Sequence, residues 1–86
     1  MAEFAFARRF LRDLAEWQGT GSPRDVEALE QALAAIAANP SLPGRVPSFY
    51  DPTAPSYLYR AGSVLIHYRV VSGGGVEFLN LLFRRL

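Results

Sequence analysis

Hydrophobic residues recur at helical spacing in the first half of the chain. The pattern predicts an amphipathic helix over 7–17, since its apolar positions return every three or four residues. These positions are Ala7, Phe10, Leu11, Leu14 and Trp17, and the charged residues between them are Arg8, Arg9, Arg12, Asp13 and Glu16. Ahead of this helix, Phe4 and Phe6 alternate with other residues and predict a short strand over 3–6, although an earlier helix start would also accommodate them.

A second helix has local start and stop signals. Ser22 is a good N-cap, Pro23 suits the first helical position, and Asp25 has capping-box spacing. The helix ends at Asn39-Pro40, because proline lacks a backbone donor and restricts the residue before it. Its apolar stripe is Val26, Leu29, Leu33, Ile36 and Ala37. Glycines 19 and 21 end the first helix, so we expect two antiparallel helices joined by a short turn.

The hydrophobic period changes to two in the last third of the chain. Segment 40–56 holds five of the six prolines and contains at most a strand fragment around 46–50. Segments 57–60, 63–71 and 76–84 are predicted strands, with hairpin turns at Ala61-Gly62 and at 72–75. The predicted fold class is α+β with the order β-α-α-β-β-β. A short N-terminal strand precedes a helical hairpin that packs on one face of a small antiparallel sheet.

The turns predict which residues pair, and the pairing predicts the two faces of the sheet. The expected pairs are Val71–Val76, Arg69–Phe78, His67–Asn80, Leu65–Leu82 and Ser63–Arg84, and in the first hairpin Arg60–Ser63 and Leu58–Leu65. The face expected to receive the helices carries Tyr57, Tyr59, Val64, Ile66, Tyr68, Val70, Leu79, Leu81 and Phe83, with Glu77 and Arg85 at its edges. The opposite face, the open face, is expected to carry Leu58, Arg60, Leu65, His67, Arg69, Phe78, Asn80, Leu82 and Arg84.

Composition fits one small domain spanning 1–86. Half of the 86 residues are hydrophobic and none is cysteine. No apolar run approaches the ~18 residues of a membrane span, and two arginines at 8–9 interrupt any signal-peptide core. We therefore expect a cytoplasmic protein with no membrane partner. The net charge is only +1, but from Pro40 onward five arginines face two acids, so this part carries a modest positive field.

Few residues suggest catalysis. One histidine, no cysteine and no spaced pair of acids predict no metal site, and the glycines at 73–75 do not precede a helix, so no cofactor is expected. Histidine ordinarily exchanges protons near neutral pH, which makes His67 the candidate general base. The alternative that we favour is a structural pairing of His67 with Asn80. Arg69 and Arg84 could clamp a phosphate, but such arginines more often meet a partner's carboxylates.

Three segments share their order and residue pattern with one known family. They are the opening FAFARRFLRDL from Phe4 to Leu14, the hairpin YLYRAGSVLIHYRV from Tyr57 to Val70, and the strand VEFLNLLFRR from Val76 to Arg85. Together they resemble the RelE/ParE family of type II toxin–antitoxin toxins. The resemblance extends over nearly the whole chain and implies a toxin that a cognate antitoxin neutralises.

Departures from the family pattern favour its non-nuclease branch. Ribosome-dependent mRNA-cleaving members carry an arginine in the central strand two or three residues before the tyrosine, whereas alignment on Tyr68 places Leu65 there. Those members also use a tyrosine or histidine after the last strand, and no residue here matches it. Arg85 or its neighbour Arg84 matches a family catalytic arginine. We therefore expect a toxin of ParE type, or another non-nuclease relative.

Two alternatives remain open at this point. One is a non-catalytic interaction module of the same fold that forms a homodimer. The other is a ribosome-dependent mRNA interferase, with Arg85, Arg84 and His67 as catalytic residues. The cellular target would be DNA gyrase or the ribosome with its mRNA. In each non-catalytic interpretation the open face binds the partner, because large apolar side chains gain roughly 1.5–3 kcal/mol each on burial. The predicted partner-binding residues are Leu58, Arg60, Leu65, Arg69, Phe78, Asn80 and Leu82.

Overall fold

A computed structural model describes residues 3–19, 21–48, 55–71 and 73–83 of the chain. These residues form β1 (Phe4–Phe6), α1 (Arg8–Gln18), α2 (Pro23–Ala38), β2 (Val46–Ser48), β3 (Ser56–Ala61), β4 (Val64–Val70) and β5 (Val76–Leu82). The predicted α+β class and the predicted order of helices and strands are confirmed. Strand β2 adds a short element in the proline-rich segment, where the sequence predicts no more than a fragment.

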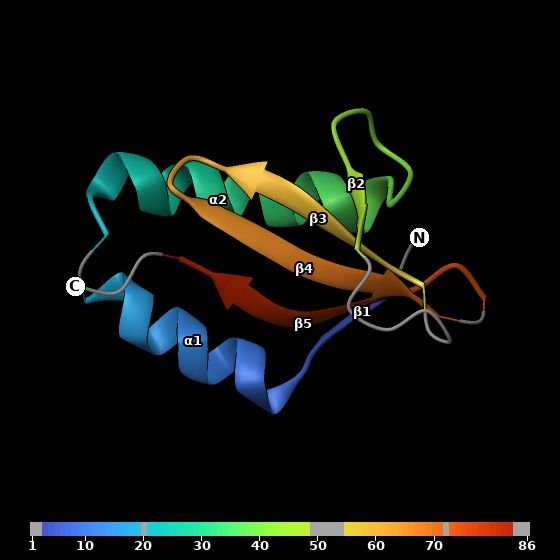
Figure 1. The fold of residues 1–86 in the computed structure, drawn as a ribbon, viewed down its shortest axis with the longest axis horizontal. Helices are drawn as coiled ribbons and strands as arrows, with labels where there is room; N and C mark the ends of the chain where they lie inside the picture. The colour runs from blue at the N-terminus through green and yellow to red at the C-terminus, as the bar shows by residue number, and fades with distance from the viewer. Residues whose placement is uncertain (1–2, 20, 49–54, 72, 84–86) are drawn as a thin grey trace.

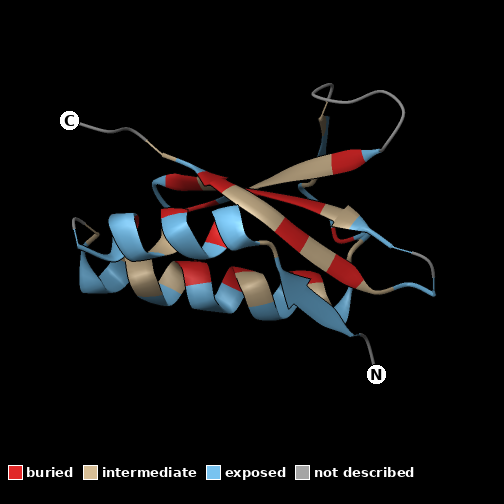
Figure 2. Cartoon of the chain, turned by 90° about the horizontal axis from the view of Figure 1, so that it is seen from below, coloured by how far each residue is buried: buried red, intermediate tan, exposed pale blue. Residues whose placement is uncertain are grey.

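The sheet and the two helices form two layers (Figures 1 and 2). Strand order across the sheet is β1-β5-β4-β3-β2, and all neighbouring strands run antiparallel except β1 and β5, which run parallel. Both helices lie on the same side of the sheet, and their buried residues face it (Figure 2). The N-terminal strand therefore forms one edge of the sheet, beside the last strand of the chain.

The buried side of α1 differs from the predicted stripe at two positions. Phe10 and Trp17 are buried as expected, but Leu11 is 50% exposed and Asp13 is buried in its place. The Asp13 carboxylate accepts a hydrogen bond from the backbone N–H of Leu81, at 3.2 Å from Oδ2. Strand β1 pairs with β5 only over Val76–Phe78, so Asp13 satisfies a donor on the part of β5 that β1 does not reach.

Helix α2 begins as its sequence predicts. The Ser22 hydroxyl accepts a hydrogen bond from the backbone N–H of Asp25 at 3.2 Å, and Pro23 occupies the first turn. Leu29 and Ile36 of the predicted stripe are buried, and Ala32 is buried between them. The helix therefore presents a continuous apolar surface to the sheet.

The hairpin between β3 and β4 turns one residue later than predicted. Ala61 pairs with Val64, so the two turn residues are Gly62 and Ser63. Gly62 has a φ of +60° and Ser63 has a negative φ, which matches a type II′ turn with glycine first. The predicted pairs of this hairpin were wrong by two residues: Leu58 pairs with His67 instead of Leu65. Because side chains alternate with a period of two, this shift leaves each residue on its predicted face.

A bulge divides the pairing between β4 and β5. The predicted pairs His67–Asn80 and Leu65–Leu82 are confirmed. Between His67 and Tyr68 the register shifts by one residue, so that Leu79 has no partner on β4. Beyond the shift the pairs are Tyr68–Phe78, Arg69–Glu77 and Val70–Val76, and the predicted pairs Arg69–Phe78 and Val71–Val76 were wrong.

The bulge exchanges the two faces over the first half of β5. Val76 and Phe78 are buried under the helices, and Phe78 has no exposed surface, so its predicted place on the open face was wrong. Leu79 and Glu77, predicted for the helix side, lie on the open face instead. The physical reason is the burial that each register requires. An unbulged pairing would bury the Glu77 carboxylate and leave the Phe78 ring in water, and both changes are costly.

Candidate functional site

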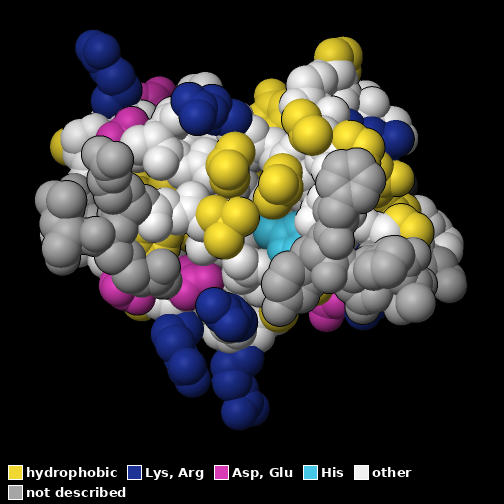
Figure 3. Space-filling model, viewed as in Figure 1, with side chains coloured by type: hydrophobic (Ala, Val, Ile, Leu, Met, Phe, Trp, Pro, Cys, Tyr) yellow, Lys and Arg dark blue, Asp and Glu magenta, His cyan; other side chains and the backbone are white. Residues whose placement is uncertain are grey.

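A groove of about 480 Å³ crosses the open face of the sheet. Strands β2 to β5 and the first turn of α1 contribute its lining, which consists of Arg9, Ser48, Ser56, Leu58, His67, Arg69, Glu77, Leu79, Asn80 and Leu82. Figure 3 shows the single histidine of the chain in a hollow of this face, with hydrophobic side chains beside it and basic side chains nearby. Four of the seven predicted partner-binding residues therefore line one groove, together with His67.

Three polar side chains form the floor of the groove. Nδ1 of His67 lies 2.7 Å from Oδ1 of Asn80, and Nε2 lies 2.7 Å from Oγ of Ser56. The amide oxygen can only accept, so Nδ1 carries the proton and donates it to Asn80. In the neutral ring Nε2 then accepts from the Ser56 hydroxyl. The predicted pairing of His67 with Asn80 is confirmed.

Ser56 is a groove residue, hydrogen-bonded to His67, that sequence reasoning missed. It begins β3 and pairs with Ser48 of β2, and His67 reaches it diagonally from β4. The observed register, in which Leu58 opposes His67, places Ser56 two residues away on the same face. The predicted register, continued by two residues from the Leu58–Leu65 pair, also brings Ser56 to His67, but the predicted strand began at residue 57 and so left Ser56 out. A strand that begins one residue earlier, at Ser56, was the signal that could have identified it.

The charged residues of the groove are paired or lie close to a carboxylate. Arg69 and Glu77 face each other across β4 and β5, and Arg69 Nε donates to Glu77 Oε1 at 2.6 Å. Arg9 enters from α1, and its Nε lies 3.9 Å from Asp13 Oδ2. Within the described lining, these two arginines are the only cations. The described part of the lining thus holds no cluster of uncompensated cations of the kind that stabilises a pentavalent phosphate.

The remaining predicted residues lie elsewhere. Leu65 is half-buried and Arg60 is exposed; both are on the open face but outside the groove lining. Phe78 belongs to the core. The candidate catalytic residues Arg84 and Arg85 lie outside the described residues. The described residues contain no group of three histidine, cysteine or acidic side chains that could hold a metal ion.

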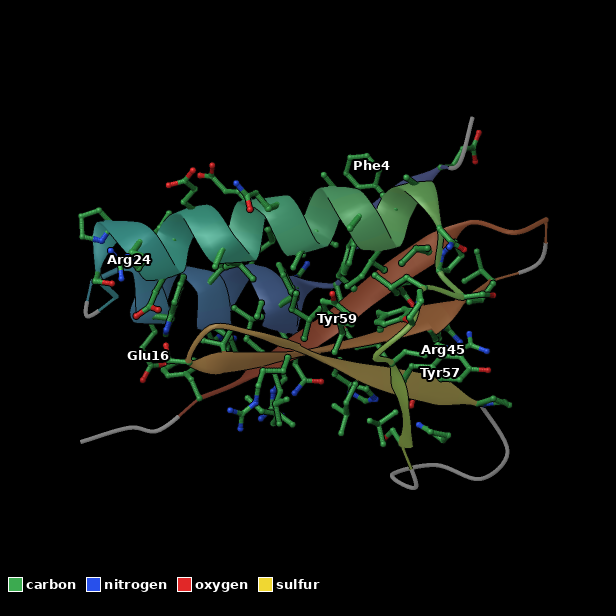
Figure 4. All side chains as sticks on the ribbon, turned by 90° about the horizontal axis from the view of Figure 1, so that it is seen from above. Phe4, Glu16, Arg24, Arg45, Tyr57 and Tyr59 are labelled. Atoms are coloured by element: carbon green, nitrogen blue, oxygen red, sulfur yellow. The ribbon has the colours of Figure 1, made fainter. Side chains whose placement is uncertain are left out.

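The tyrosines of the hairpin lie on the helix side of the sheet, as predicted. Tyr68 is fully buried, and its hydroxyl donates to the carbonyl oxygen of Pro40 at 2.7 Å. The guanidinium of Arg45 lies 4.0 Å from the centre of the Tyr57 ring, and Figure 4 shows these two side chains next to each other. Tyr59 packs against the core on the same side. Burial raises the pKa of the Tyr68 phenol, and the nearby Arg45 charge opposes this shift.

No family model and no curated protein sequence matches this chain. None of the helices in the described part of the chain is long and apolar enough to cross a membrane.

Proposed function

We propose that this chain is a cytoplasmic toxin of RelE/ParE type that acts without cleaving RNA and whose open face is covered by a cognate antitoxin. The observation that carries the proposal is the groove. It lies on the open face of the sheet, where Arg9 reaches it from the start of α1, and it combines leucine walls with arginines. The β-α-α-β-β-β order and the three sequence segments quoted above support the same conclusion.

The apolar part of the groove favours a protein ligand. Leu82 is 44% exposed, and Leu58 and Leu79 are only partly buried. A partner that covered these three side chains would gain part of the roughly 1.5–3 kcal/mol that each complete burial provides. A contiguous apolar surface rimmed by polar groups is typical of an interaction site.

Charge complementarity defines the partner segment further. Arg9 and Arg69 line the groove, Arg60 lies on the same face, and Glu77 is the one acidic side chain in the described lining. We therefore expect an antitoxin segment in which apolar residues alternate with acidic ones. It would bind as an amphipathic helix or as an added strand.

Three features support an action other than RNA cleavage. Leu65 occupies the position where the resembling nucleases carry an arginine. The charge of Arg69 is compensated by Glu77, and the described lining of the groove holds no lysine and only one other arginine. We place DNA gyrase first among the targets, by resemblance to the ParE branch.

Induced expression in a bacterium tests this proposal. We expect growth arrest with intact mRNA and altered plasmid supercoiling. We expect relief when a cognate antitoxin, to be sought in a short reading frame next to the gene, is expressed with the toxin. Message cleaved at ribosomes would identify an mRNA interferase and overturn the non-nuclease assignment. Normal growth, with a homodimer that buries the groove, would identify an interaction module.

A matched pair of variants tests the docking surface itself. Leu82→Glu places a carboxylate in the groove, whereas Leu11→Glu changes an equally exposed leucine on α1. We expect Leu82→Glu to arrest growth but to lose relief by the antitoxin, since the charge would oppose the acidic partner segment. Leu11→Glu should keep both properties. Equal relief of the two variants would mean that the antitoxin binds elsewhere.

A further inference from the structure

The floor of the groove contains a serine hydroxyl, an imidazole and an amide side chain in one hydrogen-bonded chain. Ser56, His67 and Asn80 come from β3, β4 and β5, and the two contacts that join them are each 2.7 Å. From this geometry we propose that these residues form a nucleophilic triad that hydrolyses small carboxylic esters. The proposal is independent of the toxin assignment.

The direction of the hydrogen bonds is the one that this chemistry requires. Asn80 Oδ1 accepts from Nδ1–H and so fixes the tautomer, which leaves the lone pair of Nε2 directed at the Ser56 hydroxyl. A serine hydroxyl is a weak nucleophile until an adjacent base accepts its proton. Once the imidazole has taken that proton, each ring nitrogen still faces an oxygen acceptor. The site can therefore hold the imidazolium that the reaction generates.

The three side chains are held by regular strand pairing. His67 lies directly opposite Asn80 on one side and opposite Leu58 on the other, and Ser56 is two residues from Leu58. Residues on paired strands keep their relative positions better than residues on loops. His67 is only 7% exposed, so its interactions operate in a largely water-excluded environment, although both His67 and Ser56 line the groove.

The groove limits the class of substrate. Its volume of about 480 Å³ is in the range of small-molecule sites, and Leu58, Leu79 and Leu82 provide an apolar wall for a short acyl chain. Arg69 lies in the same lining, and only its Nε is hydrogen-bonded to Glu77. Its remaining N–H groups can donate to the oxyanion that forms at the carbonyl oxygen.

The reaction proceeds in two balanced steps. Ser56 Oγ attacks the carbonyl carbon while its proton moves to His67 Nε2, and the ester C–O bond then breaks as Nε2 returns the proton to the leaving alcohol. A water molecule next attacks the acyl-serine and gives its proton to Nε2. The acid is released when that proton returns to Ser56 Oγ.

Activity-based labelling tests the triad. The full-length protein is treated with a fluorophosphonate, the modified residue is located by peptide mass spectrometry, and hydrolysis of p-nitrophenyl acetate is measured in parallel. We expect modification at Ser56 in the wild-type protein. Ser56→Ala should lose both the modification and the hydrolysis, and His67→Gln should lower the hydrolysis rate by about 10²-fold or more. Ser41→Ala changes an exposed serine outside the groove lining and should retain both activities.

Two results would overturn the proposal. One is folded wild-type protein that the probe leaves unmodified at Ser56. The other is hydrolysis that is equal in wild type and Ser56→Ala. The pH dependence of the hydrolysis rate distinguishes catalysis from a structural role. If His67 is the base, the rate of acylation must rise as the ring loses its proton, whereas a purely structural hydrogen bond gives no such rise.

Discussion

Arg69 and Glu77 form an ion pair across β4 and β5, with 2.6 Å between Nε and Oε1. This pair exists because the bulge at Leu79 turns Glu77 to the open face and Phe78 to the core. In the unbulged register Arg69 would oppose Phe78. The bulge therefore determines both the ion pair in the groove and which side chains of β5 line it.

The bulge predicts opposite sensitivities for these two adjacent residues. Phe78→Ala should destabilise the fold by about 3–5 kcal/mol, because it removes a fully buried ring from the core. Glu77→Gln should cost less than about 1 kcal/mol, because both partners of the ion pair are partly exposed and solvent screens them. Urea unfolding monitored by circular dichroism measures both. Similar small losses for the two variants would contradict the bulged register.

Neighbouring leucines at the end of β5 provide a second test of the two faces. Leu81 is buried beneath the helices and Leu82 is 44% exposed on the open face. Leu81→Ala should cost about 2–5 kcal/mol, whereas Leu82→Ala should cost much less in the absence of a partner. The same unfolding assay compares them. A larger loss from Leu82→Ala would mean that the open face is covered in the isolated protein.

Asp13 should be important to the fold although it is charged. Asp13→Ala removes the oxygen that accepts the Leu81 N–H and leaves a buried donor unsatisfied, at a cost of about 1–3 kcal/mol. Asp13→Asn keeps an oxygen acceptor and should lose less. Glu30→Ala, at an exposed position of α2, is the control and should be nearly neutral. Amide exchange at Leu81 should accelerate in Asp13→Ala alone, and unchanged exchange would exclude this role.

The buried phenol of Tyr68 predicts a loss of stability in alkali. Burial raises its pKa in the folded state, so the unfolded chain releases the proton first and stability falls as pH rises above about 10. Below that pH the stability that the protonated Tyr68 phenol contributes is fully present. Tyr68→Phe should weaken this pH dependence and cost about 0.5–1.5 kcal/mol at neutral pH through the lost bond to Pro40. Tyr59→Phe is the control, and an identical alkaline profile in both variants would contradict the assignment.

Local signals in the sequence determined most of the secondary structure. Ser22, Pro23 and Asn39-Pro40 specify the ends of α2 without help from the rest of the chain, because capping and proline geometry act over a few residues. The alternation of apolar and polar residues, with a period of two, determined which residues of β3 and β4 face the helices. The error of two residues in the first hairpin did not alter this result, since only odd shifts exchange the faces.

Tertiary structure alone decided the features that build the groove. The bulge at Leu79 follows from the competition between Phe78 and Glu77 for the core, which local periodicity does not reveal. The burial of Asp13 depends on the edge of β5 that β1 leaves unpaired, far away in the sequence. Ser56 lies outside the predicted strand 57–60, and only the structure, in which β3 begins at Ser56, shows that its hydroxyl meets His67. The sequence by itself determined the helices, the main strands and the faces of β3 and β4, whereas long-range packing determined the register of β5 and, with it, the groove.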